Sequence, residues 1–115
     1  MKRRLIGWAL AAAVLGFSLA CARPLPLRAL RAGVKAAQAE DWEAAVRYWT
    51  EAVRAKPGSV PAHNNLAVAH EKTGDWEAAR REYEEALRLD PDNSTVRTNY
   101  AAFKIRLGSA RGTRP

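Results

Sequence analysis

His63 and His70 come closer to a metal-binding pattern than any other residues of this chain. They are seven residues apart, so they share nearly the same face if the segment is helical. Seven residues of helix span about 10 Å, which is too far for both rings to bind one metal ion. The sequence also lacks a glycine-rich phosphate loop and an HExxH zinc motif. We therefore expect no metal site, no cofactor and no enzymatic activity.

Cys21 is the only cysteine, so neither a disulfide network nor a cysteine-rich metal site can form. It follows three basic residues, Lys2 to Arg4, and sixteen uncharged residues, Leu5 to Ala20. A basic start, a short apolar run and small residues before a cut site are typical of a secretory signal peptide. We interpret residues 1–20 as such a leader.

The segment Phe17 to Cys21 resembles the lipobox of bacterial lipoproteins, although Ser18 and Leu19 depart from its commonest form. The resemblance implies that Cys21 becomes the lipidated first residue, with Ala20 as the small residue that the peptidase requires. The protein would then be held at a cell-envelope membrane, facing the periplasm or the outer surface.

Two other interpretations of the leader remain open. An uncleaved anchor helix of eighteen uncharged residues, Leu5 to Ala22, would be about 27 Å long and would just span a bilayer core. Ordinary cleavage would instead give a secreted protein with a free thiol.

The formal net charge of +7 is partly a property of the leader. Without Lys2, Arg3 and Arg4 the chain keeps 16 basic and 12 acidic side chains, and these are interleaved. Mixed charge on helices is typical of a solvated face, so we do not expect nucleic-acid binding.

A 34-residue repeat organises the rest of the chain. The pentad DWEAA at Asp41 to Ala45 returns unchanged at Asp75 to Ala79. Further identities keep the same offset: Arg47 and Arg81, Glu51 and Glu85, Pro57 and Pro91, Asn65 and Asn99, Gly74 and Gly108. This period with helical patterning is a signature of stacked helix-turn-helix units. The sequence therefore predicts an all-α repeat solenoid.

Five helices are predicted, over residues 27–39, 42–55, 60–73, 76–89 and 94–107. Proline, glycine and capping residues separate them, as at Pro57 to Ser59 and at Gly74 and Asp75. We expect residues 21–26 to form a linker and residues 109–115 a basic, disordered tail.

The spacing of large and small residues resembles the tetratricopeptide repeat. The second unit supplies His63-x2-Leu66-Ala67-x2-His70, followed by Ala79-x3-Tyr83 and Pro91. The resemblance covers about residues 26–108, as two units (27–59 and 60–93) and a closing helix (94–108). It places both histidines in packing positions.

The family pattern also indicates a core. Small residues should allow helices to cross closely at Ala45, Ala52, Ala67, Ala79, Ala86 and Ala101. Trp49 and Tyr83 should fill the space between helices. An apolar stripe on the last helix, Val96, Tyr100, Phe103 and Leu107, should pack on helix 76–89.

The resemblance implies a concave groove that binds a segment of a protein partner. Its lining residues would be Leu30, Arg31, Val34, Asn64, Asn65, Val68, Glu71, Lys72, Thr98, Asn99, Ala102, Ile105 and Arg106. The family's clamp for acidic C-termini is not carried over, because Leu30 and Val34 stand where it needs lysine and asparagine. The alternative is that these residues are merely solvated.

Together these features predict a membrane-anchored interaction scaffold or assembly adaptor of the cell envelope. The alternative is a small accessory subunit of an envelope complex, docked through its convex helix faces around residues 77–88. So few repeats form a small stack, which favours stabilisation by a partner or by a homodimer.

Overall fold

A computed structural model describes residues 25–112, and these residues form five α-helices without a strand. The helices are α1 (Leu25–Gln38), α2 (Trp42–Ala55), α3 (Val60–Thr73), α4 (Trp76–Leu89) and α5 (Ser94–Gly112). The all-α repeat prediction is confirmed. The leader, Cys21 and the last three residues lie outside the described part of the chain.

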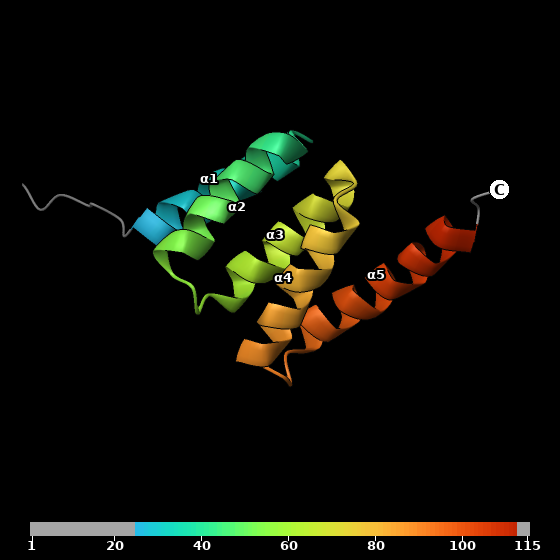
Figure 1. Ribbon diagram of the computed structural model, residues 1–115. Coiled ribbons are helices and arrows are strands. Elements are labelled where there is room, and N and C mark those ends of the chain that lie inside the picture. The colour runs from blue at the N-terminus through green and yellow to red at the C-terminus, as the bar shows by residue number, and fades with distance from the viewer. Residues whose placement is uncertain (1–24, 113–115) are drawn as a thin grey trace, which may run out of the picture.

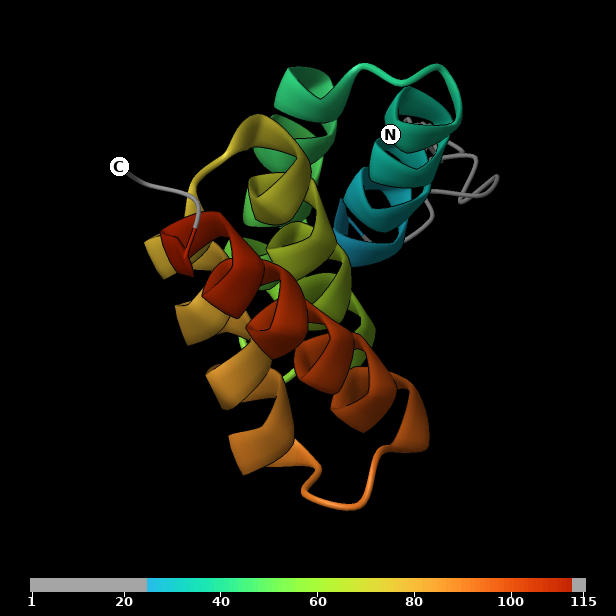
Figure 2. The ribbon, with the colours of Figure 1, turned by 90° about the vertical axis from the view of Figure 1, so that its right-hand side faces the viewer.

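The helices stack as pairs (Figure 1). α1 packs against α2, α3 packs against α4, and α2 joins the two pairs by packing on α3. α5 follows α4 and lies along the α3–α4 pair, as the rotated view shows (Figure 2). Odd-numbered and even-numbered helices therefore form the two layers of a short solenoid.

The repeated pentad builds the same helix start twice. The Asp41 carboxylate accepts a hydrogen bond from the backbone N–H of Ala44 at 3.0 Å, and Asp75 accepts one from Ala78 at 3.1 Å. Each bond satisfies an N–H group that the first turn leaves without a helical partner. The predicted capping role of Asp75 is confirmed, and Asp41 caps the corresponding helix of the first unit.

The predicted linker extends too far, because α1 begins at Leu25 and includes Pro26. A proline in the first turn of a helix costs little, since the N–H that it lacks would have no helical acceptor there.

The predicted end of the last helix is also too early. α5 continues through Gly108 to Gly112, so residues 109–112 are helical rather than disordered. The Ser109 hydroxyl donates to the Ile105 carbonyl at 3.1 Å, and Arg111 lies in the last turn, where a cation complements the helix dipole.

Small and aromatic residues make up the core as predicted, with one exception. The alanines at positions 45, 52, 67, 79 and 86 are buried, and so are Trp49 and Tyr83. The stripe on α5 packs on α4, where the ring centroids of Tyr83 and Phe103 lie 5.5 Å apart. Ala101 is exposed, because no helix among the described residues covers that side of α5.

Candidate functional site

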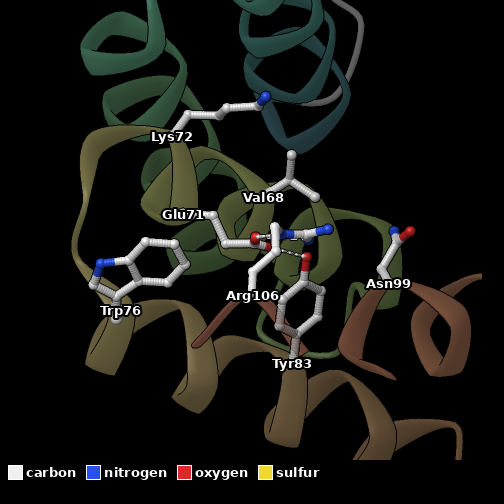
Figure 3. Close-up of a pocket in the computed structure, with 7 residues that line it drawn as sticks. All are labelled: Val68, Glu71, Lys72, Trp76, Tyr83, Asn99 and Arg106. Atoms are coloured by element: carbon white, nitrogen blue, oxygen red, sulfur yellow. Dashed lines mark hydrogen bonds and ion pairs between the residues drawn. The ribbon is translucent and has the colours of Figure 1, made fainter. Parts of the chain in front are cut away.

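A hollow of about 450 Å³ opens between α3 and α5. Its lining residues are Val68, Glu71, Lys72, Trp76, Tyr83, Asn99 and Arg106 (Figure 3). Five of these seven were predicted from the family pattern. Trp76 and Tyr83 were not, because they come from α4, which forms the second layer beneath the two groove helices. The helix register places them in the core but does not show that they reach the hollow.

Glu71 is the centre of the polar contacts in this hollow. Its carboxylate accepts a hydrogen bond from the Tyr83 hydroxyl at 2.6 Å and another from Arg106 Nε at 2.9 Å. Arg106 Nη2 lies 2.7 Å from the same Glu71 oxygen that binds Nε. The Glu71 side chain is 8% exposed and that of Arg106 is 52% exposed. The buried carboxylate is therefore neutralised, and the guanidinium is fixed at the surface.

Tyr83 supports this arrangement from below. Burial raises the pKa of its hydroxyl, and the hydrogen bond to Glu71 raises it further. The phenol therefore stays protonated at neutral pH and donates to Glu71. Because Tyr83 is fully buried, the carboxylate is held in place from the core side.

Lys72 extends away from Glu71, toward the first pair of helices (Figure 3). Its Nζ lies 5.5 Å from the ring centroid of Trp42 on α2, a distance at which a cation is attracted to an aromatic face. Lys72 is exposed, and its ammonium group lies at the boundary between the two units.

The asparagines mostly bind one another. Asn99 Nδ2 donates to Asn64 Oδ1 at 3.0 Å, which links α5 to α3 across 35 residues of sequence. Asn64 is only 8% exposed, so much of its hydrogen-bonding capacity is used inside the protein. A smaller hollow of about 230 Å³, lined in part by Asn64 and Asn65, lies toward the start of both helices. Asn99 is the member of this group that reaches the larger hollow.

The predicted residues of the first helix do not join the hollow between α3 and α5. Leu30 packs into the core and lines a separate hollow of about 480 Å³ beside the α2–α3 loop. Arg31 lines a different hollow, together with Arg28 and Lys35. Val34 is 39% exposed.

The last three predicted lining residues, Thr98, Ala102 and Ile105, are on α5 but do not line the hollow between α3 and α5. Ile105 is 72% exposed and is the most exposed large apolar side chain among the described residues. It precedes Arg106 in sequence, but adjacent residues of a helix do not face the same way, and only Arg106 lines the hollow.

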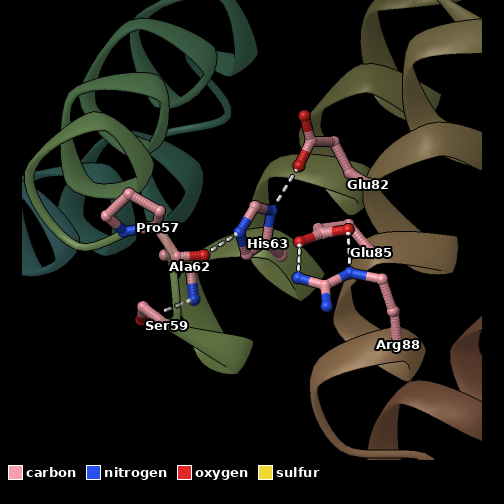
Figure 4. Close-up of polar contacts among 7 residues, drawn as sticks. All are labelled: Pro57, Ser59, Ala62, His63, Glu82, Glu85 and Arg88. Atoms are coloured by element: carbon pink, nitrogen blue, oxygen red, sulfur yellow. Dashed lines mark hydrogen bonds and ion pairs between the residues drawn. The ribbon is translucent and has the colours of Figure 1, made fainter.

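His63 is engaged in structural contacts (Figure 4). One ring nitrogen lies 2.6 Å from Glu82 Oε2 and the other lies 2.7 Å from the Pro57 carbonyl oxygen. The ring is 5% exposed, as expected for a packing position. Sequence patterning did not indicate Glu82 as its partner. No group of three His, Cys, Asp or Glu side chains within residues 25–112 could hold a metal ion.

None of the five described helices has the length and apolar character needed to cross a membrane.

Sequence comparison identifies the family. A model of the tetratricopeptide repeat matches residues 28–94, which is more than half of the chain, so the protein belongs to the tetratricopeptide repeat family. No match was found among curated proteins. Repeats of this family generally mediate protein–protein interactions and are generally not enzymes.

Proposed function

We propose that this tetratricopeptide repeat protein is a membrane-anchored scaffold of the cell envelope, which captures a segment of a partner protein between α3 and α5. The observation that carries the proposal is the hollow that contains the Glu71–Arg106 pair. It combines an apolar wall, a fixed cation and a volume of about 450 Å³.

The hollow offers complementary chemistry to a peptide. Val68 and Trp76 supply apolar surface, and the exposed side chain of Ile105 lies on the same helix as Arg106. Arg106 uses Nε and Nη2 to bind Glu71 and still has N–H groups that can donate to a carbonyl or carboxylate. Because Glu71 holds the guanidinium in place, little side-chain entropy is lost when a partner binds.

The anchor is proposed from the sequence alone. A lipid on Cys21, or an uncleaved leader, would leave a short connection before α1 begins at Leu25. Mass spectrometry of the protein from the membrane fraction tests this proposal. An N-terminus at acylated Cys21 supports it, whereas an unmodified Cys21 at the N-terminus of a soluble protein refutes it.

Docking through the convex face is less favoured. Arg80 pairs with Glu77 at 2.7 Å, and Arg88 pairs with Glu85 at 2.6 Å. The exposed cations of α4 that make these contacts are already matched by acids on the same helix, so they give a partner little unmatched charge.

A matched pair of charge-reversal variants tests the groove. Lys72→Glu alters a residue that lines the hollow, and Lys104→Glu alters an exposed position outside it. The two lysines are comparable, since Lys104 Nζ also lies over an aromatic ring, 4.8 Å from the centroid of Tyr100. Each variant therefore loses one cation–aromatic contact and gains one acidic side chain.

The readout is crosslinking in intact cells to the partner that the unaltered protein captures. We expect the groove variant to lose the crosslinked product while the control variant keeps it, with equal helix content in both. Loss in both variants, or in neither, would refute recognition by the groove. Loss in the control alone would place the partner on the open face of α5.

A further inference from the structure

The outer face of α1 carries an unpaired basic patch, formed by Arg28, Arg31 and Lys35. All three side chains are exposed, and none makes an ion pair or hydrogen bond with the described residues. α1 itself contains no acidic residue. Glu51 of α2 shares a hollow with Arg28 but does not pair with it.

The 34-residue register shows why this patch faces outward. Arg28 corresponds to Ala62 and Val96, which follow it at intervals of 34 residues. Lys35 corresponds in the same way to Ala69 and Phe103. The four apolar residues are at most 1% exposed, because this side of α3 and α5 packs on the preceding unit.

No described unit covers the equivalent side of α1. The two positions that are buried in α3 and α5 are occupied in α1 by the exposed cations Arg28 and Lys35. Two large apolar side chains accompany them in the first turn of the helix. Leu25 is 54% exposed and Leu27 is 37% exposed. A basic helix face with exposed leucines at one end is typical of a surface that rests on anionic lipid.

A second copy of this chain is a poor occupant for the patch. The far end of the stack is the open side of α5, where Arg97 and Lys104 occupy the positions that correspond to His63 and His70. Both side chains are exposed, and α5 contains no acidic residue. Stacking the two ends of the solenoid together would bring like charges into contact, which is unfavourable.

The start of α1 also limits where this face can lie. Cys21 precedes Leu25 by four residues, which span about 14 Å even when fully extended. A lipid or an anchor helix at that point would hold the first turn of α1 within a short distance of the membrane surface.

We propose that the patch of Arg28, Arg31 and Lys35 docks on an anionic lipid surface and sets the orientation of the repeat domain on the membrane. The orientation of the domain rests on the membrane anchor in the proposed function, whereas binding of the patch to anionic lipid does not, and neither depends on capture of a partner by the groove. α1 lies on the membrane, and the hollow between α3 and α5 is one unit further away.

Lysine footprinting of the full-length protein tests the proposal. The protein is reconstituted in vesicles of phosphatidylcholine, with or without phosphatidylglycerol, and acetylation of each lysine is followed by mass spectrometry. We expect the acetylation rate of Lys35 to fall about fivefold when the anionic lipid is present at low salt. Lys104, at the far end of the stack, should keep its rate and is the internal control.

Salt and charge variants identify the cause of the protection. At about 1 M salt the screening length falls to about 3 Å, so the acetylation rate of Lys35 should recover. Arg28→Gln with Arg31→Gln should also restore it, whereas Arg97→Gln with Arg111→Gln should not. Equal acetylation of Lys35 and Lys104 on anionic vesicles would overturn the proposal. Protection of Lys35 by an added acidic protein, but not by anionic vesicles, would also overturn the proposal.

Flotation of the vesicles separates this proposal from that of the anchor. If the protein floats with phosphatidylcholine vesicles but Lys35 stays unprotected on anionic ones, the anchor stands and docking is refuted. If it floats only with anionic vesicles and Lys35 is protected, docking stands and the anchor is refuted. No flotation with either kind of vesicle refutes both.

Discussion

The indole of Trp49 lies directly against the backbone of Gly33, so that a Cβ atom placed on Gly33 would be 2.2 Å from Trp49 Nε1. The indole N–H also donates to the Leu30 carbonyl at 3.0 Å, one turn earlier on the same helix. In the second unit the corresponding residues are Ala67 and Tyr83, which share one buried cluster. Trp49, the larger of the two aromatic residues, therefore occurs with glycine, whereas Tyr83 occurs with alanine.

This relationship predicts that Gly33→Ala is destabilising. The new methyl group would force the indole to move and would weaken its hydrogen bond to Leu30. Overpacking of this kind lowers the free energy of unfolding by about 1–3 kcal/mol. Urea unfolding followed by circular dichroism measures the effect.

Gly108→Ala is the matched control, because Gly108 also lies in a helix but a Cβ there would contact nothing within 4 Å. Alanine should raise the free energy of unfolding by roughly 0.5–1 kcal/mol at this position. Trp49→Tyr should partly rescue Gly33→Ala, with a coupling of about 0.5–3 kcal/mol. Additive effects of the two substitutions would show that the ring does not limit the size of residue 33.

Glu40 provides a second prediction, because it follows α1 with a φ of +57°, in the left-handed region. Gly74 occupies the corresponding position after α3 with a φ of +81°. A residue other than glycine in this region carries a backbone cost of about 1 kcal/mol. We therefore expect Glu40→Gly to raise the free energy of unfolding by up to about that amount.

Gly74→Ala is the reciprocal variant and should lower the free energy of unfolding by about 1 kcal/mol. A Cβ on Gly74 would meet no atom within 4 Å, so this loss reports the backbone alone. Changes of the same sign for Glu40→Gly and Gly74→Ala would contradict the shared left-handed requirement.

The stacking of the helices could be predicted from the sequence because each repeat unit uses the same stabilising interactions. An aspartate that caps a helix at position 41 caps one again at position 75, and each pentad is followed by a buried aromatic residue at the same spacing. The predictions were wrong at the two ends of the 34-residue repeat. Pro26 and Ala101 lie at the two ends of the stack, where no neighbouring unit fixes the environment of the position.

The candidate site was predicted in part. The register correctly placed Glu71 and Arg106 on groove helices, but it did not show that they pair across 35 residues of sequence. That contact depends on how far α5 is rotated and displaced relative to α3, which side-chain packing determines. The pairing of His63 with Glu82 escaped prediction because it depends in the same way on how α4 packs against α3.

His70 predicts a dependence of stability on pH. Burial lowers the pKa of its ring from the usual 6.5, although Asp75 and Glu82 partly oppose the shift. The unfolded chain therefore binds a proton at higher pH than the folded protein does. The contribution of His70 to stability is present above pH 6.5 and is lost as the pH falls through the pKa of the folded state.

His70→Gln should flatten this part of the pH profile. The free energy of unfolding of the unaltered protein should fall more steeply than that of the variant between about pH 7 and pH 5. Urea titrations at several pH values measure both slopes. Parallel slopes would mean that His70 titrates alike in the folded and unfolded chain.

The Glu71–Arg106 pair predicts a strong asymmetry between single and double variants. Arg106→Ala removes the cation from a carboxylate that is only 8% exposed and leaves it with the Tyr83 hydroxyl. We expect the free energy of unfolding to fall by about 1–3 kcal/mol, less than for a fully buried pair because Arg106 is half exposed.

Glu71→Gln with Arg106→Gln should cost less than Arg106→Ala alone, because no buried charge is then left without a partner. The amide oxygen at position 71 can still accept from the Tyr83 hydroxyl, so the contact with α4 persists. Thermal unfolding of the two variants and the unaltered protein measures the comparison. A double variant less stable than Arg106→Ala would contradict this prediction, because it would show that the Glu71 carboxylate stabilises the protein even without its cation.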